Sequence, residues 1–518
     1  MATSEPATSE PASVPDAAPP QPSPLEKLPL HLLQTIAEEL AACDDPERRS
    51  LFALSLVSRI FNVATKGQRF HYIHLVVKSA EQLRREIERR HEWLRANEAL
   101  GHVRILKVSG CMSLEEEPNT AEQNAGPSVA PSKADAEQEA QSGDDDCMYD
   151  PCRLPRAPIH FHPSRHRQGP EKQRYEAAWA PLTLFLSKLP GLTDLVHACK
   201  DQISPSVLAA FQQHHPKGRL HMHTFSLPSL FRPLGDSRPI HEDDLALITS
   251  PCLYSISLEY RQWVIDATDH DDTLQFGPYR INHNRHVVQQ MMRGLAPRLA
   301  KVHIFHKREC RPKGSPWTRR FFTASWDKLD TFFAHPTGDV SGVSRLQELS
   351  IPGLHMSYGG PVNVLQELCE EHIDLSNLRS LTMQHHTTKA ILETLVNMAT
   401  GGQLPHLSEL SLTVEDMVSS QETIDSLIAT VILALPPLRS LSLRGDLGIN
   451  TYRAVLDYGP SLRKLVFVPE NISYIGTLGA KRWSELTASW AQNLRERHVA
   501  VQRLTLGSYK SRYIKENI

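Results

Sequence analysis

The sequence has few of the features that mark a secreted, membrane-bound or nucleic-acid-binding protein. Its 518 residues hold only eight cysteines, which stand far apart and are typical of thiols in a reducing compartment rather than of a disulfide framework. The net charge is −3, so no global positive field attracts nucleic acid or a membrane surface. We therefore expect no nucleic-acid partner, no membrane partner, and a cytoplasmic or nuclear location.

Long hydrophobic runs and catalytic motifs are missing as well. The longest uncharged and mostly apolar run, residues 426–438, is shorter than the about 20 residues that a membrane-spanning helix needs. The chain contains no H-E-x-x-H, G-x-S-x-G, P-loop or G-x-G-x-x-G string. The sequence therefore supports no catalytic residue, no cofactor and no enzyme activity.

Two segments have compositions that cannot form a core of their own. Residues 1–24 hold seven prolines and no Lys, Arg or aromatic residue, which predicts a disordered tail. Residues 112–146 carry ten acidic side chains and one Lys, and residues 153–174 then turn basic. An acidic run without aromatic residues buries too little apolar surface to offset chain entropy. We interpret residues 112–178 as a flexible insert.

Cysteine and histidine residues are the candidate metal ligands. Cys147 and Cys152 stand in the insert, ahead of three histidines, but this order fits no common zinc spacing. Further histidines occur as close pairs outside the insert: His214 with His215, His221 with His223, and His385 with His386. We expect these pairs to be exposed polar side chains. The sequence therefore predicts no metal site.

The segment after the tail predicts three short helices. Apolar residues repeat at helical spacing along the first helix, at Leu32, Leu33, Ile36, Ala37 and Leu40. Asp45 and Pro46 are typical of the start of a second helix. Ser58 predicts the cap of a third helix, which Gly67 is expected to end. A strand at 72–77, a helix around 83–94 and a strand at 103–108 follow.

An irregular repeat occupies the rest of the chain. The string apolar-x-x-apolar-x-apolar begins at Leu346, Leu378, Leu407, Leu438 and Leu462, with weaker copies at Leu192, Met222, Leu253, Leu299 and Val501. Its last three positions alternate apolar and polar, which predicts a short strand with one buried face, and helical patterns lie between copies. One strand and one helix cannot bury their own apolar faces, so neighbouring repeats must stack. This predicts an α/β solenoid with a parallel strand ladder on its concave side.

Both parts of the chain resemble known families. The five strong copies resemble the L-x-x-L-x-L core of leucine-rich repeats, in an irregular form. Residues 25–36 and the string Leu-Ser-Leu-Val-Ser-Arg at 54–59, followed by Phe61, resemble an F-box of the fungal type. The resemblances imply a small N-terminal three-helix F-box module followed by an irregular leucine-rich-repeat solenoid. The implied division is a tail at 1–24, an F-box-like module at 25–75, a linker helix and first repeat at 76–111, the insert, and the repeat array at 179–518.

The F-box resemblance also implies partners and a role. Such a module binds a Skp-type adaptor, and through it a cullin, while the repeats bind a protein substrate. The chain would then be a non-catalytic substrate-recognition subunit of an SCF-type ubiquitin ligase. The implied adaptor-binding positions are Leu28, Pro29, Leu32, Leu33, Ile36, Leu40, Leu51, Leu54 and Val57. Two alternatives stay open, because these residues can instead form a three-helix core, and the chain can be a repeat scaffold that recruits no ligase.

The phase of the repeats predicts which side chains face outward from the strand ladder. These are Glu348, Ser350, Ser380, Thr382, Glu409, Ser411, Ser440, Ser442, Lys464 and Val466. A row of small hydroxyls with little net charge is a poor phosphate-binding surface. It either packs side by side on adjacent strands without any ligand or forms part of a substrate surface.

Overall fold

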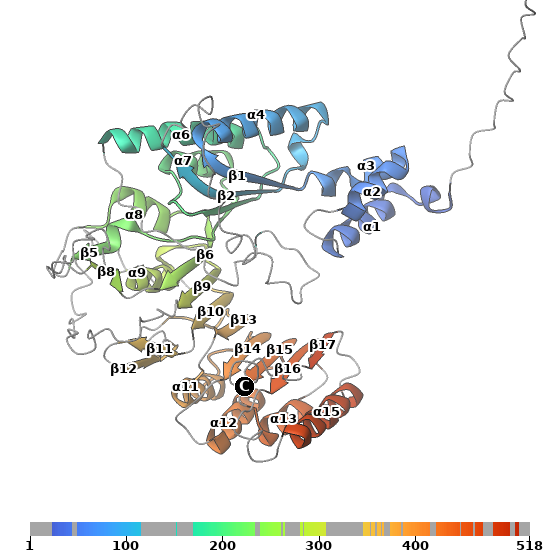
Figure 1. Ribbon diagram of the computed structural model, residues 1–518, viewed down its shortest axis with the longest axis vertical. Helices are drawn as coiled ribbons and strands as arrows, with labels where there is room; N and C mark the ends of the chain where they lie inside the picture. The colour runs from blue at the N-terminus through green and yellow to red at the C-terminus, as the bar shows by residue number, and fades with distance from the viewer. Residues whose placement is uncertain are drawn as a thin grey trace, which may run out of the picture. The chain divides into compact units, whose positions relative to one another are not determined.

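The computed structural model divides the chain into two compact units, each described here by itself (Figure 1). Among the described residues, the first unit ends at His71 and the second begins at Tyr72. The structure describes residues 23–43, 49–114, 152, 169–233, 239–260, 263–264, 280–282, 284–306, 345–352, 354–357, 360–363, 365–366, 373–384, 387–414, 421–445, 447–458, 461–469, 480–497 and 503–506. The predicted tail, and Asp45 and Pro46 of the predicted second helix start, lie outside these residues.

The first unit consists of one 3-10 turn and three helices. These are η1 (Leu25–Lys27), α1 (Leu30–Cys43), α2 (Arg49–Val57) and α3 (Arg59–Arg69). Helix α3 packs against both α1 and α2. The core is formed by Leu33 of α1 with Phe61 and Ala64 of α3. Because so few side chains are fully buried, the unit holds only a small hydrophobic core.

The sequence predicts the start of α3 correctly but not its end. Ser58 stands at the N-cap position with extended backbone, but its side chain caps no amide among the described residues. The helix also continues past Gly67 to Arg69. A glycine costs a helix only about 1 kcal/mol. The last turn is held by the Arg69 guanidinium, which lies over the rings of Phe52 and Phe70.

The second unit is built on one sheet of twelve strands, and each pair of neighbours in it is parallel. The strands lie in chain order: β1 (Tyr72–Ser79), β2 (Ile105–Ser113), β3 (Asp194–Cys199), β4 (Arg219–Met222), β6 (Leu253–Tyr260), β9 (Lys301–His306), β10 (Glu348–Pro352), β13 (Ser380–Gln384), β14 (Glu409–Val414), β15 (Ser440–Gly445), β16 (Lys464–Pro469) and β17 (Arg503–Leu506). The predicted α/β class with a parallel strand ladder is therefore confirmed.

Helices connect most of these strands and pack against one another in chain order. They are α4 (Ala80–Ala96), α6 (Gly169–Ser187), α7 (Pro205–His214), α8 (Glu242–Ile248), α9 (Asn284–Gln290) with a π-helical turn η4 (Met291–Leu295), α11 (Lys389–Thr400), α12 (Gln421–Ala434), α13 (Ile449–Asp457) and α15 (Ala480–Arg497), besides short 3-10 turns η2 (Leu100–His102) and η3 (Pro228–Leu230). Small antiparallel sheets add β5 (Phe231–Pro233), β8 (Arg280–Asn282) and β7 (Trp263–Val264), and β11 (Leu354–Ser357) with β12 (Gly360–Asn363).

The repeat residues form continuous rows across the sheet. One row runs through Leu349, Leu381, Leu410, Leu441, Leu465 and Leu504, and the next through Ile351, Met383, Leu412, Leu443, Phe467 and Leu506. Phe467 meets Trp490 of α15 edge-on, so the helices cover this face of the sheet. Each buried Leu or Ile contributes about 1.5–3 kcal/mol relative to an exposed one. The members of these rows on β10 to β16 are all buried and form the main core of the second unit.

The opposite face of the sheet carries the predicted outward-facing side chains, and we call it the open face. Thr382, Ser411 and Ser442 stand side by side on it, and each is half-buried. Ser350 and Val466 differ from the prediction because both are buried. The Gln384 amide donates a hydrogen bond of 2.6 Å to Ser350 Oγ, which covers that hydroxyl.

One weak repeat copy and both ends of the insert depart from the sequence pattern. Strand β4 ends at Met222, where the sequence places the start of a copy, because the chain turns away there and the Phe225 amide bonds to the Ser257 carbonyl. Regular structure enters both ends of the predicted insert, since β2 extends to Ser113 and α6 begins at Gly169. Between residues 115 and 168, the structure describes Cys152 alone.

Strand β15 ends in a glycine that no other residue can replace without strain. Gly445 has φ +101°, and a Cβ added there would lie 2.0 Å from the Val414 carbonyl oxygen. We expect Gly445→Ala to lower the free energy of unfolding by about 3 kcal/mol, because backbone strain and a clash add. Gly402→Ala is the matched control, since Gly402 has φ +66° with open space around its Cβ position. Equal losses for the two variants in urea denaturation would contradict this account.

Candidate functional site

The first unit exposes a concentration of apolar side chains. Of the thirteen large hydrophobic side chains that the described part of the chain exposes, seven belong to this small unit. They are Leu25, Leu30, Leu32, Phe52, Leu56, Val57 and Val63, which we call the apolar surface. Leu56 and Val57, at the end of α2, are 86% and 66% exposed. More than half of the exposed large apolar side chains of the described residues thus lie on this unit, which makes it the candidate interaction site.

The predicted adaptor-binding residues fall into three classes of exposure. Pro29, Leu32 and Val57 are exposed, Leu28, Ile36, Leu40 and Leu54 are half-buried, and Leu33 and Leu51 are buried. Leu33 belongs to the core of the unit, and Leu28, Ile36 and Leu54 pack against that core. The exposed and half-buried residues can therefore contact a partner directly, whereas the buried ones cannot.

Sequence reasoning missed five residues of the apolar surface: Leu25, Leu30, Phe52, Leu56 and Val63. A signal for two of them is present in α2, whose nine residues read Arg-Ser-Leu-Phe-Ala-Leu-Ser-Leu-Val. A helix that is apolar on every side must be covered on every side. Two neighbouring helices cannot do this, so part of α2 has to stay exposed or bind a partner.

Arg69 positions Phe52, one residue of the apolar surface. The Arg69 guanidinium carbon lies 5.1 Å from the centre of the Phe52 ring, and its Nη1 donates a 2.6 Å hydrogen bond to Asn62 Oδ1. A cation over an aromatic face stabilises the pair by about 0.5–1 kcal/mol at an exposed site. Phe52 is therefore held in place by Arg69.

A second group of functional side chains lies on the open face, where β3 and β4 are neighbours. Parallel pairing places Asp194 opposite Arg219, and His221 opposite Ser255 of β6. The Asp194 carboxylate accepts hydrogen bonds from His221 Nε2 at 2.9 Å, from Arg219 Nε at 2.6 Å and from Thr193 Oγ1 at 2.7 Å. His221 Nδ1 lies 2.8 Å from Ser255 Oγ. Asp194 and His221 are both buried, whereas the Arg219 side chain is 44% exposed, so only the centre of this network is shielded from solvent.

These bonds decide the charge of Asp194. Burial alone raises the pKa of the carboxyl group, but the hydrogen bonds from His221, Arg219 and Thr193 outweigh burial and hold the pKa well below its usual range. The hydrogen-bonded ion pair with Asp194 in turn raises the pKa of Arg219. The carboxylate is therefore ionised throughout the physiological pH range.

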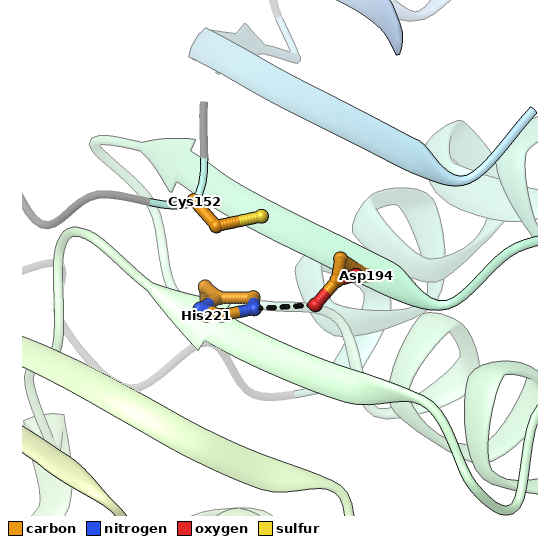
Figure 2. Close-up of side chains that lie close together, drawn as sticks. All are labelled: Cys152, Asp194 and His221. Carbon is orange, nitrogen blue, oxygen red and sulfur yellow. Dashed lines mark hydrogen bonds and ion pairs between the residues drawn. The ribbon is translucent and has the colours of Figure 1, made fainter. Parts of the chain in front are cut away.

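Cys152 completes this group. Its Sγ, a carboxylate oxygen of Asp194 and a ring nitrogen of His221 all lie within 4.8 Å of one another. Figure 2 shows how the three side chains lie. The three side chains do not form a cysteine nucleophile with a histidine base, because both ring nitrogens of His221 already face Asp194 and Ser255. The donor set instead matches the atoms that bind transition metals.

The expected exposure of the histidine pairs is wrong for three of the four histidines that the structure describes. His215, His221 and His223 are buried, and only His214 is exposed. His385 and His386 lie outside the described residues. The prediction relied on polarity alone. The structure instead buries these rings with partners on the backbone or on neighbouring strands, as for His215, whose Nε2 lies 3.0 Å from the Leu186 carbonyl.

A further buried histidine makes stability depend on pH. The His197 ring lies against Trp179 of α6, and neither ring nitrogen has a hydrogen-bond partner among the described residues. Burial lowers the pKa of His197 to about 4. The unfolded chain takes up this proton near pH 6.5 and the folded chain only near pH 4, so the free energy of unfolding falls as pH decreases through that window. The full loss from this group is roughly 3 kcal/mol.

We expect His197→Leu to weaken this acid sensitivity. The variant removes a group that is protonated in the unfolded state but not in the folded state over this window, so unfolding free energies at pH 7 and pH 4.5 should differ less than in the unchanged protein. His214→Leu, at an exposed position, is the control and should leave the difference unchanged. His223, whose pKa burial lowers to about 3, preserves part of the slope in both. The same pH dependence in both variants would contradict the role of His197.

Comparison with known proteins identifies no family for this chain. No family model matches it, and no curated protein gives a significant match. Among the described helices, none has both the length and the hydropathy that crossing a membrane requires. The apolar surface and the group around Asp194 are therefore interpreted from their own geometry.

Proposed function

We propose that this chain is a substrate-recognition subunit of an SCF-type ubiquitin ligase. In this proposal the first unit is an F-box module that binds a Skp-type adaptor, and through it a cullin. The second unit is an irregular leucine-rich-repeat array that binds a protein substrate. The chain itself carries out no chemistry. The observation that carries the proposal is the apolar surface of the first unit.

The size of the first unit explains why this surface needs a partner. Three short helices around a core of Leu33, Phe61 and Ala64 leave Leu56 and Val57 largely in water. Burying one such side chain fully is worth about 1.5–3 kcal/mol. Several of them on one small unit favour binding to another helical protein, the mode in which amphipathic helices bind partners.

The second unit supports the proposed substrate role by its regularity. Its strands follow one another in chain order, and the leucine rows stack from β10 to β17. Such an array leaves one long face for a partner. On that open face, the uncharged hydroxyls of Thr382, Ser411 and Ser442 stand side by side on neighbouring strands. Such a row suits a protein partner better than a polyanion.

The mechanism that follows is proximity. A substrate held on the array and a transferase held through the cullin become parts of one assembly, which raises the effective concentration of substrate lysines at the transferase. The chain needs no catalytic residue for this. Its contribution is to bind both sides at once.

Reconstitution tests the proposal. The full chain is immobilised and mixed with purified Skp-type adaptor and cullin, separately and together. We expect the adaptor to be retained alone and the cullin to be retained only when the adaptor is present. Retention of neither protein would contradict the ligase role and favour the alternative, a repeat scaffold without ligase recruitment.

A further inference from the structure

A thiol, a carboxylate and an imidazole converge on the open face of the second unit. Cys152, Asp194 and His221 are far apart in the sequence, yet their donor atoms lie within 4.8 Å of one another (Figure 2). Asp194 and His221 are fixed on neighbouring strands, whereas Cys152 stands in a turn. We propose that these three side chains bind one zinc ion. The proposal is independent of the ligase function.

The donor set fits zinc better than other common ions. Zinc accepts thiolate, imidazole and carboxylate ligands together, at about 2.3 Å to sulfur and about 2.0–2.2 Å to nitrogen and oxygen. Tetrahedral ligands are then roughly 3–4 Å apart. His221 Nε2 and Asp194 Oδ1 are 2.9 Å apart, close to that spacing, so the approach of Cys152 completes the triangle. Three protein ligands leave a fourth position for water or another ligand.

The neighbouring residues orient the ligands as a metal site requires. Ser255 Oγ lies 2.8 Å from His221 Nδ1, the ring nitrogen that does not face the site. Thr193 Oγ1 donates to Asp194 Oδ2, the carboxylate oxygen away from His221. Ligating histidines nearly always donate their other nitrogen to such a partner, and ligating carboxylates are themselves hydrogen-bonded. Both ligands are therefore held in place before any ion binds.

Arg219 sets a limit on the kind of ion. Its guanidinium binds both oxygens of Asp194, at 2.6 Å and 2.9 Å, and its positive charge repels any cation at the site. Magnesium and calcium depend on several oxygen ligands. An ion that gains most of its binding from thiolate and imidazole tolerates a weakened carboxylate. This favours zinc over magnesium and calcium and predicts a lower affinity than that of closed sites with four protein ligands.

Binding moves protons in a defined way. Zinc takes the place of the hydrogen between His221 Nε2 and Asp194 Oδ1, and the neutral ring then carries its proton on Nδ1, where Ser255 accepts it. The Cys152 thiol loses its proton to solvent when the zinc–sulfur bond forms. One proton is therefore released per ion, and affinity falls as pH decreases.

The test uses the full chain after removal of metals by a chelator. Zinc is titrated by calorimetry, and cobalt(II) by absorption, since a cobalt–thiolate bond gives a charge-transfer band. We expect one ion per chain and a cobalt–thiolate band that Cys152→Ser and His221→Asn both abolish. Cys111→Ser, which removes an exposed thiol, is the control and should keep the band. Ser255→Ala should weaken zinc binding about 10-fold to 100-fold.

Several results would overturn the proposal. One is the absence of stoichiometric binding. Another is a band that Cys152→Ser abolishes but His221→Asn keeps, because the ion would then belong to Cys152 and other residues of the insert. If His221→Asn fails to fold by circular dichroism, Ser255→Ala decides, and an unchanged zinc affinity would contradict the site. Adaptor binding is also measured with the chelated protein. A protein that binds the adaptor but no zinc contradicts the zinc site and leaves the ligase proposal intact.

Discussion

Replacing Leu56 and Val57 together by aspartate is expected to weaken binding of the full chain to a Skp-type adaptor by about 100-fold or more. Both side chains are mainly in water in the free protein, so the change leaves the core of the first unit intact. In the complex, two carboxylates would have to be buried against an apolar partner without ion-pair partners, which is strongly unfavourable. Calorimetry with purified adaptor measures the loss.

The matched control is Leu433→Asp. Leu433 lies on α12 of the second unit and is 63% exposed, similar to Val57, so it reports what an exposed leucine-to-aspartate change does by itself. We expect adaptor affinity to stay unchanged in this variant. Leu33→Asp is not informative, because Leu33 is 1% exposed in the core and the variant would lose the fold of the unit. Unchanged binding by the Leu56/Val57 double variant would refute the proposed surface.

Replacing Asp425 by alanine is expected to lower the free energy of unfolding by about 3 kcal/mol or more. This buried carboxylate on α12 accepts hydrogen bonds from the backbone amides of Gly448, Asn450 and Thr451, at 2.8–2.9 Å. Those amides form the start of α13, whose free N–H groups attract negative charge. Alanine leaves three amide donors, two of them buried, without their acceptor and disconnects two neighbouring repeats.

Two further variants isolate the effect of Asp425. Asp425→Asn keeps the size of the side chain and one acceptor oxygen, so it should recover part of the stability. Asp374→Ala removes an exposed aspartate that accepts a hydrogen bond from the Ser376 amide, and it should cost less than 1 kcal/mol, as is usual for surface changes. Urea denaturation at pH 7 measures all three. Equal losses at Asp425 and Asp374 would contradict the account.

The repeat strands could be predicted from the sequence because their side chains alternate strictly. Leu381, Leu410 and Leu441 each stand two residues before another apolar residue, and each lies in a strand that pairs in the expected register. Strand β4 could not be located in this way. It has Arg219 and His221 on its open-face side, and these polar side chains are held by Asp194 instead of by apolar packing. Tertiary partners there replace the hydrophobic pattern on which the prediction depends.

The two candidate sites differ in how far the sequence could lead to them. For the apolar surface, the F-box resemblance included Leu32 and Val57 but could not separate them from Leu33 and Leu51, because a three-helix unit uses its apolar residues for both core and surface. The group of Cys152 with Asp194 and His221 depends on strand register and on the position of one residue of the insert. No local spacing carries that information.

The central claim is adaptor binding, and calorimetric titration of the full chain with purified Skp-type adaptor tests it most directly. We predict a one-to-one complex with a negative heat-capacity change, because the apolar surface leaves water when the complex forms. The Leu56/Val57 double variant should give no such complex under the same conditions. Absence of binding by the unchanged, folded chain would contradict the claim and leave the chain as a repeat scaffold.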